Sequence, residues 1–231
     1  MNYHELKSEC YQANLLLPEY KLIDLTFGNV SVCDRGQRVL AIKPSGVDYA
    51  VLQADDIVVL DFNGTILEGK LRPSSDTPTH LRLFQAFTGI RAIVHTHSRN
   101  AVAFAQAGIP IPCFGTTHAD YFYGSIPVTR PMNIDEVNSG YELQTGNVIV
   151  ERFKDLDPLA MRAVLVHGHG PFAWGASGQN AVENALALEI VAEIALKTIQ
   201  LKSEAGSISQ HLLDKHYLRK HGEEAYYGQL R

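Results

Sequence analysis

Two short hydrophobic runs of this chain each end in a His-x-His triplet, at residues 95–97 and 167–169. Runs of β-branched and aliphatic residues of this length are typical of buried strands. Because side chains alternate between the two faces of a strand, histidines two positions apart point to the same face and can bind one ion. A catalytic zinc needs three protein ligands and keeps a further position open. The pattern predicts a metal site and leaves open both the metal and the choice among four candidates, His95, His97, His167 and His169.

The composition narrows the class of protein. Of the 231 residues, 45% are hydrophobic and 19% charged, which suits one soluble globular domain. The formal net charge of −5 disfavours a nucleic-acid partner, and we see neither a signal peptide nor a membrane span. The three cysteines, Cys10, Cys33 and Cys113, are far apart and form no C-x-x-C pair. This argues against a disulfide framework and a thiolate zinc site, and a cytoplasmic location follows as the default.

The order of elements predicts an α/β domain with a largely antiparallel sheet covered by helices. An Asn-Gly turn at 63–64 predicts a hairpin between strands 56–60 and 65–68. The longest helix is expected to open with a capping box of Asn180 and Glu183. We further expect helices at 4–17, from about 75, at 99–107 and at 180–201, and strands at 22–32, at 39–42, through the first triplet and at 161–167.

Three loop segments, 26–29, 43–46 and 73–78, combine small hydroxyl residues with glycine or a helix start. Such segments present N–H and O–H donors that suit a phosphate, although they can equally be ordinary turns and caps. A fourth polar segment, 116–121, offers Asp120 as an acid/base group and His118 as a residue that orients it, or else plain surface residues.

The C-terminal tail is the last candidate. Its first half predicts a helix that presents His216, Arg219 and Lys220 to an anion, and it ends near Tyr226 and Tyr227. Tails are usually frayed, but two tyrosines are costly to leave in water. We therefore expect them to dock on the same or a neighbouring subunit.

Eight motifs, read together, identify a family resemblance: GNVS, IKPSGVDY, PSSDTPTH, IVHTHS, GTTHADYFYG, TGNVIVE, VLVHGHGPFAWG and LLDKHYLRKHG with AYYGQ. They closely resemble the class II aldolase family, and within it the branch of the L-ribulose-5-phosphate 4-epimerases. The resemblance spans the chain and implies a three-layer α/β/α fold with a mainly antiparallel central sheet. It also implies a homotetramer in which the tail, from about 210 to 231, completes the site of a neighbouring subunit.

The resemblance implies roles for individual residues. It makes His95, His97 and His169 the ligands of a zinc ion, which Mn²⁺ or Co²⁺ could replace, sets Asp76 at the metal and leaves His167 outside the ligand set. The implied acid/base groups are Asp120 and Tyr227, the latter from a neighbouring subunit and with Tyr226 as its alternative. The expected substrate and phosphate contacts are Gly28, Asn29, Lys43, Ser45, Gly46, Ser74, Ser75, Thr116, Glu142, His216 and Arg219.

The implied activity interconverts L-ribulose 5-phosphate and D-xylulose 5-phosphate. The C3–C4 bond is broken by retro-aldol cleavage and remade on the other face, in the catabolism of arabinose or of ascorbate. Asp76 favours the epimerase, because the fuculose-phosphate aldolase branch carries a longer glutamate at this position. The alternatives are a class II aldolase of the L-fuculose-phosphate type, a sugar-phosphate dehydratase, and a non-catalytic binding module such as the adducin head domain.

Overall fold

The computed structural model describes residues 3–222, 225 and 226. Within them, seven strands form one sheet in the order β4-β3-β2-β1-β5-β7-β6, and every neighbouring pair is antiparallel. This confirms the predicted α/β fold with its antiparallel sheet. The strands are β1 Asn29–Asp34, β2 Val39–Ile42, β3 Val58–Asp61, β4 Ile66–Glu68, β5 Ala92–His95, β6 Ala163–Leu165 and β7 Pro171–Gly175.

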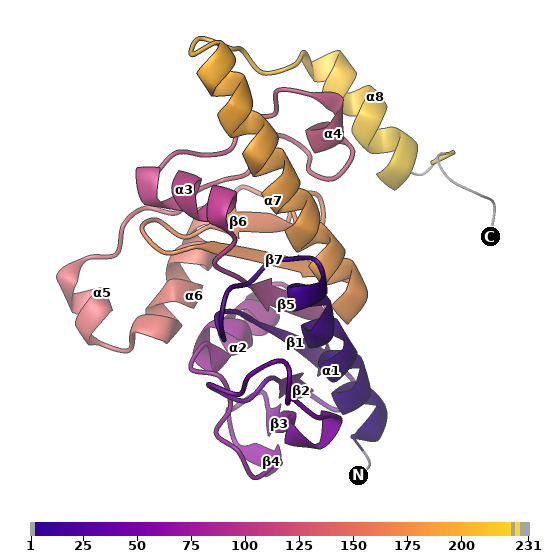
Figure 1. The fold of residues 1–231 in the computed structure, drawn as a ribbon, viewed down its shortest axis with the longest axis vertical. Helices are drawn as coiled ribbons and strands as arrows, with labels where there is room; N and C mark the ends of the chain where they lie inside the picture. Colours follow the sequence, from indigo (N-terminus) through magenta and orange to yellow (C-terminus); the bar gives the residue numbers. More distant parts are fainter. Residues whose placement is uncertain (1–2, 223–224, 227–231) are drawn as a thin grey trace.

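Helices cover both faces of the sheet, which gives the three layers α/β/α (Figure 1). Helices α1, α3 and α7 pack together on one side, and α2 packs against α6 on the other. Helices α4 and α8 pack on each other beside the C-terminal end of α7. The helices are α1 His4–Glu19, α2 Thr77–Ala86, α3 Arg99–Ala107, α4 Thr116–Ala119, α5 Ile134–Asn138, α6 Tyr141–Arg152, α7 Gly178–Leu201 and α8 Gln210–His221, with one 3₁₀ turn, η1 Ala54–Asp56.

Strand β1 shows how the alternation of side chains separates the two faces of the sheet. Val30 and Val32 are buried towards α1 and α7, where Val32 lies beside Gly178. Asn29 and Ser31 point to the opposite face, where they bond to residues of α2 and its N-terminal cap. A strand with one apolar and one polar face can therefore join the core on one side and supply hydrogen-bonding groups to a site on the other.

Several expected element boundaries are corrected. The strand expected at 22–32 begins only at Asn29, because residues 22–28 form turns and bends. Helix α1 continues past Pro18 to Glu19. The long helix α7 is capped by Ser177, whose hydroxyl accepts from the N–H of Asn180, so the capping box at Asn180 and Glu183 was wrong.

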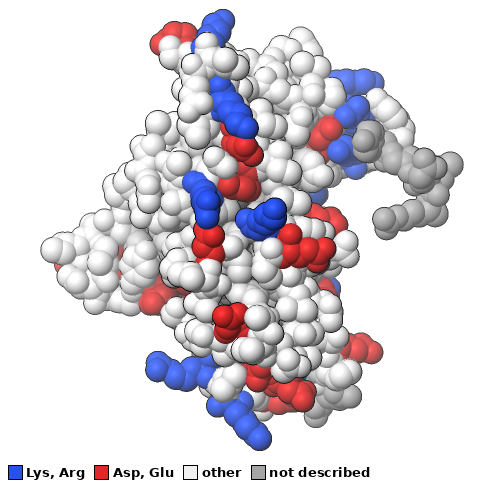
Figure 2. Space-filling view, in the orientation of Figure 1, with Lys and Arg blue, Asp and Glu red and all other residues white. Residues whose placement is uncertain are grey.

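One face of the molecule shows how the charged side chains are distributed. Basic and acidic side chains are interspersed over the face shown in Figure 2, without a continuous basic stripe. Of the helices in the described part of the chain, none has both the length and the apolar character that crossing a bilayer requires.

Candidate metal centre

Three of the four candidate histidines converge. One side-chain nitrogen from each of His95, His97 and His169 lies within 4.8 Å of the others. The rings are edge to face, with centroids 4.8 to 5.1 Å apart and interplanar angles of 69 to 76°. Three imidazoles at this separation can hold one metal ion.

The hydrogen bonds of His95 show that the cluster suits a cation. Its Nδ1 lies 3.0 Å from the carbonyl oxygen of Pro171, so Nδ1 carries the proton and donates it. Its Nε2, left with a lone pair, lies 3.2 Å from Nε2 of His97. A cation would bind two such lone pairs, and a hydrogen bond donated by the far nitrogen is the usual arrangement for a metal-binding histidine. The donor set therefore fits a divalent transition metal.

The two triplets are built differently. In the first, His95 ends β5 opposite Asn29 of β1 and Phe172 of β7, and its ring stacks on Phe172 at 4.2 Å. The second triplet does not end a strand, because β6 stops at Leu165 and residues 167–169 form the turn to β7.

In that turn the two histidines part. Gly168 has φ +69°, a conformation that glycine adopts without strain. His169 joins the cluster, whereas the ring of His167 lies against Gly108 at the end of α3. The strand alternation expected for this triplet was therefore wrong, and the turn separates the ligand candidate from its neighbour.

Asp76 lies at the N-terminus of α2 and faces the same pocket. Its carboxylate accepts from the side-chain amide of Asn29 at 2.6 Å, and that amide also donates to the hydroxyl of Ser74. Burial works to raise the pKa of Asp76, but the nearby His95 and the Asn29 amide together lower it. Asp76 is thus held as a carboxylate, although it is not among the groups whose ligand atoms meet within 4.8 Å.

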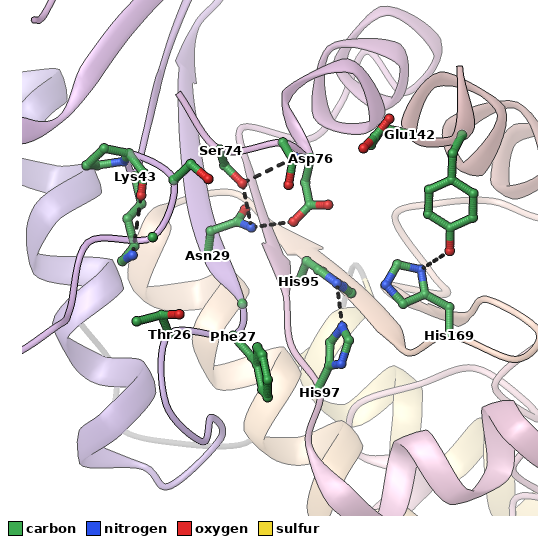
Figure 3. A pocket seen from close by; sticks show the side chains of 16 residues that line it. Thr26, Phe27, Asn29, Lys43, Ser74, Asp76, His95, His97, Glu142 and His169 are labelled. Atoms are coloured by element: carbon green, nitrogen blue, oxygen red, sulfur yellow. Dashed lines mark hydrogen bonds between the residues drawn. The ribbon is translucent and has the colours of Figure 1, made fainter. Parts of the chain in front are cut away.

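A pocket of about 380 Å³ joins the histidines to the predicted phosphate loops (Figure 3). Twelve of the expected site residues line it: Gly28, Asn29, Lys43, Ser45, Gly46, Ser74, Ser75, Asp76, His95, His97, Glu142 and His169. Its remaining lining residues are Thr26, Phe27, Pro44 and Tyr141. In Figure 3, Asn29, Ser74 and Asp76 lie between Lys43 on one side and the histidines on the other.

The loops at the Lys43 side present donors. Gly28 has φ +88°, and a Cβ there would lie 2.7 Å from the carbonyl oxygen of His95. Gly46 has φ +69° and faces open space. In the described part of the chain, the backbone N–H groups of Gly46 and Ser75 have no protein acceptor, so they are available to an anion in the pocket.

Lys43 provides a buried positive charge beside these loops. Its side chain is 1% exposed, and its ammonium donates to the carbonyl oxygens of Val47 and Pro44 and lies 4.5 Å over the ring of Tyr49. Burial lowers the pKa of Lys43, and Asp48 opposes this effect. Tyr49 in turn donates to the carbonyl of Gly28 at 2.8 Å. Tyr49 thereby links the loop of Lys43 to the loop of Gly28.

The other expected groups meet elsewhere. Asp120 follows α4, which begins at Thr116, and accepts a pair of bonds from Arg219 at 2.9 Å and one from His216 at 3.1 Å. Lys220 adds an ion pair at 3.4 Å. Burial works to raise the pKa of Asp120, but the bonds from Arg219 and His216 lower it.

None of the residues of this α4–α8 cluster (Thr116, Asp120, His216, Arg219 and Lys220) lines the pocket. His118 does not orient Asp120, because its Nε2 bonds to the carbonyl of Gly124 at 2.8 Å. Tyr227 lies outside the described residues. Tyr226, its alternative, is 64% exposed beside α8.

Two residues of the site were not expected from the sequence. Tyr141, the first residue of α6, places its hydroxyl 3.2 Å from Nδ1 of His169. His80 lies behind the pocket, completely buried, with Nδ1 2.6 Å from the hydroxyl of Ser31. Burial lowers the pKa of His80 to about 3, so its ring is neutral. The one hint of Tyr141 in the sequence was its position between Gly140 and the expected site residue Glu142.

The antiparallel α/β/α fold and the three-histidine cluster, with loops beside it that present N–H and O–H donors, can now be compared with known proteins. Residues 8–196 match the family model described as "Class II Aldolase and Adducin N-terminal domain", and the chain belongs to that family.

Solved structures agree. An L-fuculose 1-phosphate aldolase is 28% identical and superposes with a TM-score of 0.72, with 92% of this chain and 94% of that chain covered. The L-fuculose-1-phosphate aldolase of Thermus thermophilus is 27% identical, with a TM-score of 0.66 and coverage of 88% and 98%. YgbL from Klebsiella pneumoniae, at 23% identity and a TM-score of 0.70 over 93% and 99%, shares the fold.

Proposed function

We propose that the chain is a zinc-dependent epimerase that interconverts L-ribulose 5-phosphate and D-xylulose 5-phosphate. The observation that carries this proposal is the shared pocket, in which the three-histidine cluster and the phosphate-type loops line one cavity. A ketopentose phosphate has a carbonyl near one end and a phosphate at the other, so such a pocket can hold both ends at once.

The chemistry explains why a metal would be needed. The hydrogen on C4 is not acidic, so the carbon cannot be inverted by deprotonation. The C3–C4 bond is β to the C2 carbonyl, and breaking it gives glycolaldehyde phosphate and the enediolate of dihydroxyacetone. A divalent ion on His95, His97 and His169 would act as a Lewis acid towards the ketone and the negative charge that cleavage creates.

The loops have a separate task. The glycolaldehyde phosphate must rotate before the bond re-forms, and it must not leave during that time. We propose that Ser45, Gly46, Ser74, Ser75 and Asn29 hold the phosphate, which is supported by their position in the lining of the pocket and by the buried charge of Lys43 beside it. We infer that retention of this fragment separates an epimerase from an aldolase.

The acid/base groups require a second subunit. Re-addition on the opposite face needs one proton-transfer group on each side of C4, for which we propose Asp120 and Tyr227. Because the α4–α8 cluster does not line the pocket of its own chain, we infer that it completes the pocket of a neighbour in a homotetramer. His216 and Arg219 then hold Asp120 in place.

We also propose a cytoplasmic location, in which the three unpaired cysteines stay reduced.

One observation favours a second candidate, a class II sugar-phosphate aldolase. Both fuculose-phosphate aldolases cover most of this chain at 27 and 28% identity. Against it stands Asp76, one carboxylate oxygen of which accepts a hydrogen bond from the amide of Asn29. A shorter, engaged carboxylate is poorly placed to act as the base of an aldolase.

A coupled assay tests the proposal. D-xylulose 5-phosphate formed from L-ribulose 5-phosphate is followed for the native protein, after chelation and after zinc is restored. Activity that disappears and returns with zinc supports the epimerase. Accumulation of free glycolaldehyde phosphate would indicate the aldolase instead, and loss of water from the sugar phosphate a dehydratase. No turnover of any kind by a zinc-loaded tetramer would reject the proposal.

A further inference from the structure

Tyr141 is the one pocket-lining residue other than the histidines themselves, within the described part of the chain, whose side chain hydrogen-bonds to a histidine of the cluster. Its hydroxyl lies 3.2 Å from Nδ1 of His169, and the two rings are 5.9 Å apart at 42°. The dashed bond to His169 in Figure 3 marks this contact. We propose that Tyr141 is a positioning residue that fixes the ring and the tautomer of His169 for metal binding.

The direction of the bond follows from the protonation of a metal ligand. A neutral imidazole carries one proton, and the nitrogen that binds a metal must be the unprotonated one. With Nδ1 facing Tyr141, the nitrogen of His169 that remains for the ion is Nε2. Nδ1 then carries the proton and donates it to the phenol oxygen. Such a second bond holds the ring in place and makes the ligating nitrogen more basic.

The three histidines differ in how they are held. His95 is buried in the sheet, donates to the backbone carbonyl of Pro171 and stacks on Phe172. His97 stacks on Phe27 at 5.6 Å. His169 stands in a turn, outside the strand ladder, and its Nδ1 faces the hydroxyl of Tyr141. Of the three, His169 is therefore the one whose ring nitrogen bonds to a side-chain hydroxyl.

Tyr141 is itself held by rigid elements. It opens α6, and its carbonyl accepts from the hydroxyl of Thr145 at 2.9 Å. The next carbonyl, that of Glu142, accepts from Thr79 of α2. Further along, Arg82 of α2 donates to Asn147 at 2.7 Å. The helix that carries Asp76 at its N-terminus thus also fixes the helix that carries Tyr141, and both side chains face one pocket.

The inference rests on the metal-binding role proposed for the three histidines, and the test separates the two. Tyr141→Phe keeps the ring and removes the hydroxyl, and Tyr11→Phe, on α1 outside the pocket, is the matched control. Zinc affinity is measured by competition with a chelator, and the visible absorption of the Co²⁺-loaded proteins reports the geometry of the site. The unfolding temperature of each metal-free protein is measured alongside.

We expect Tyr141→Phe to lower zinc affinity by about 10- to 100-fold, the usual effect of losing a partner of a ligating histidine. We also expect an altered Co²⁺ spectrum, an unfolding temperature of the metal-free protein close to that of the wild type, and no change in Tyr11→Phe. Wild-type affinity and an unchanged spectrum in Tyr141→Phe would overturn the inference alone. A wild-type protein that binds no zinc would overturn the proposed metal function, and the inference with it.

Discussion

The pocket and the α4–α8 cluster are built on different principles. In the pocket, the positions of His95 and Asn29 are set by the pairing of β1 with β5, and Phe172 is set by the pairing of β5 with β7. In the α4–α8 cluster, one carboxylate, Asp120, gathers the side chains of His216, Arg219 and Lys220 from a helix about a hundred residues later.

On the proposed function, this difference teaches how one chain could carry two halves of a site that is completed only between subunits. Strand pairing fixes which residues lie opposite one another and which face their side chains point to. This suits the strict geometry of a metal site. Packing of α8 on α4 instead gathers charged side chains of distant residues around one carboxylate, with side chains only 16 to 22% exposed. On the proposed function, the first region binds and activates the substrate and the second moves its protons.

The largest effect is expected for a metal ligand. His97→Asn should empty the metal site. Turnover should fall by much more than roughly 100-fold, which is the largest usual effect of losing a hydrogen-bond partner of a metal ligand. The matched control is His167→Asn, in the other triplet, whose ring lies against Gly108 and not in the cluster. Metal content after dialysis and turnover are measured for both. Full metal content in His97→Asn, or its loss in His167→Asn, would show that the ligand set has been wrongly chosen.

A change in the α4–α8 cluster should separate chemistry from metal binding. Asp120→Asn is expected to reduce the epimerase rate by about 10²- to 10⁴-fold, the usual value of a general acid/base, with bound zinc unchanged. Asp214→Asn is the control, because Asp214 lies on the same helix as Arg219 and accepts from Tyr123 and Gln210. If Asp120→Asn keeps its rate or loses its zinc, Asp120 does not have the proposed role.

A pair of glycines tests whether zinc binding depends on the close packing of the loop of Gly28 against His95. Gly28→Ala and Gly124→Ala both force a side chain into a positive φ, of +88° and +108°. We expect each to lower the free energy of unfolding by about 1 to 3 kcal/mol. Only at Gly28 would the new Cβ meet the carbonyl of His95, at 2.7 Å, so only Gly28→Ala should also weaken zinc binding. Urea unfolding measures the loss of stability, and chelator competition measures the zinc affinity. Equal zinc affinities in the two variants would contradict the expected effect of Gly28→Ala on zinc binding.

A smaller effect, on stability alone, is expected from His118. Burial lowers the pKa of His118 to about 4, from 6.5. As the pH falls from about 6.5 to about 4, His118 therefore binds a proton in the unfolded chain but stays neutral in the folded protein. Over this interval the free energy of unfolding should fall by up to about 1.4 kcal/mol per pH unit for this residue, and the contribution is complete above pH 6.5. In His118→Gln, urea unfolding at several pH values should show a shallower acid loss, and an identical slope would exclude His118 as its source.

The sequence predicts the parts of the fold that local patterns determine. The Asn63–Gly64 hairpin, the strand before His95 and the helix at 99–107 follow from turn chemistry and hydrophobic spacing. Helix α6 could not be predicted in this way, because its sequence is rich in Thr, Gly, Asn and Val, which are poor helix formers. Its stability comes from packing on α2, where Gly146 lies so close to Arg82 that a Cβ would come within 2.8 Å.

The same limit applies to the site. The resemblance and the spacing find the histidines and the loops, but Tyr141 depends on α6 and was missed for that reason. The hydrophobic run before His167 predicts a strand through the triplet, whereas the close pairing of β6 with β7 makes the triplet a turn. Side-chain periodicity cannot show where a strand will reverse, so the separation of His167 from His169 needed the structure.

The turn position of His169 has a consequence for the stability of the whole fold. A bound ion would link the end of β5 to the β6–β7 turn and so close a loop of roughly seventy residues, which includes α3 to α6. Closing a loop of this length removes many conformations from the unfolded chain, as a disulfide does. In a protein whose three cysteines are unpaired, three imidazoles and one ion would form a reversible cross-link, and the segment between them would be secured each time the metal is loaded.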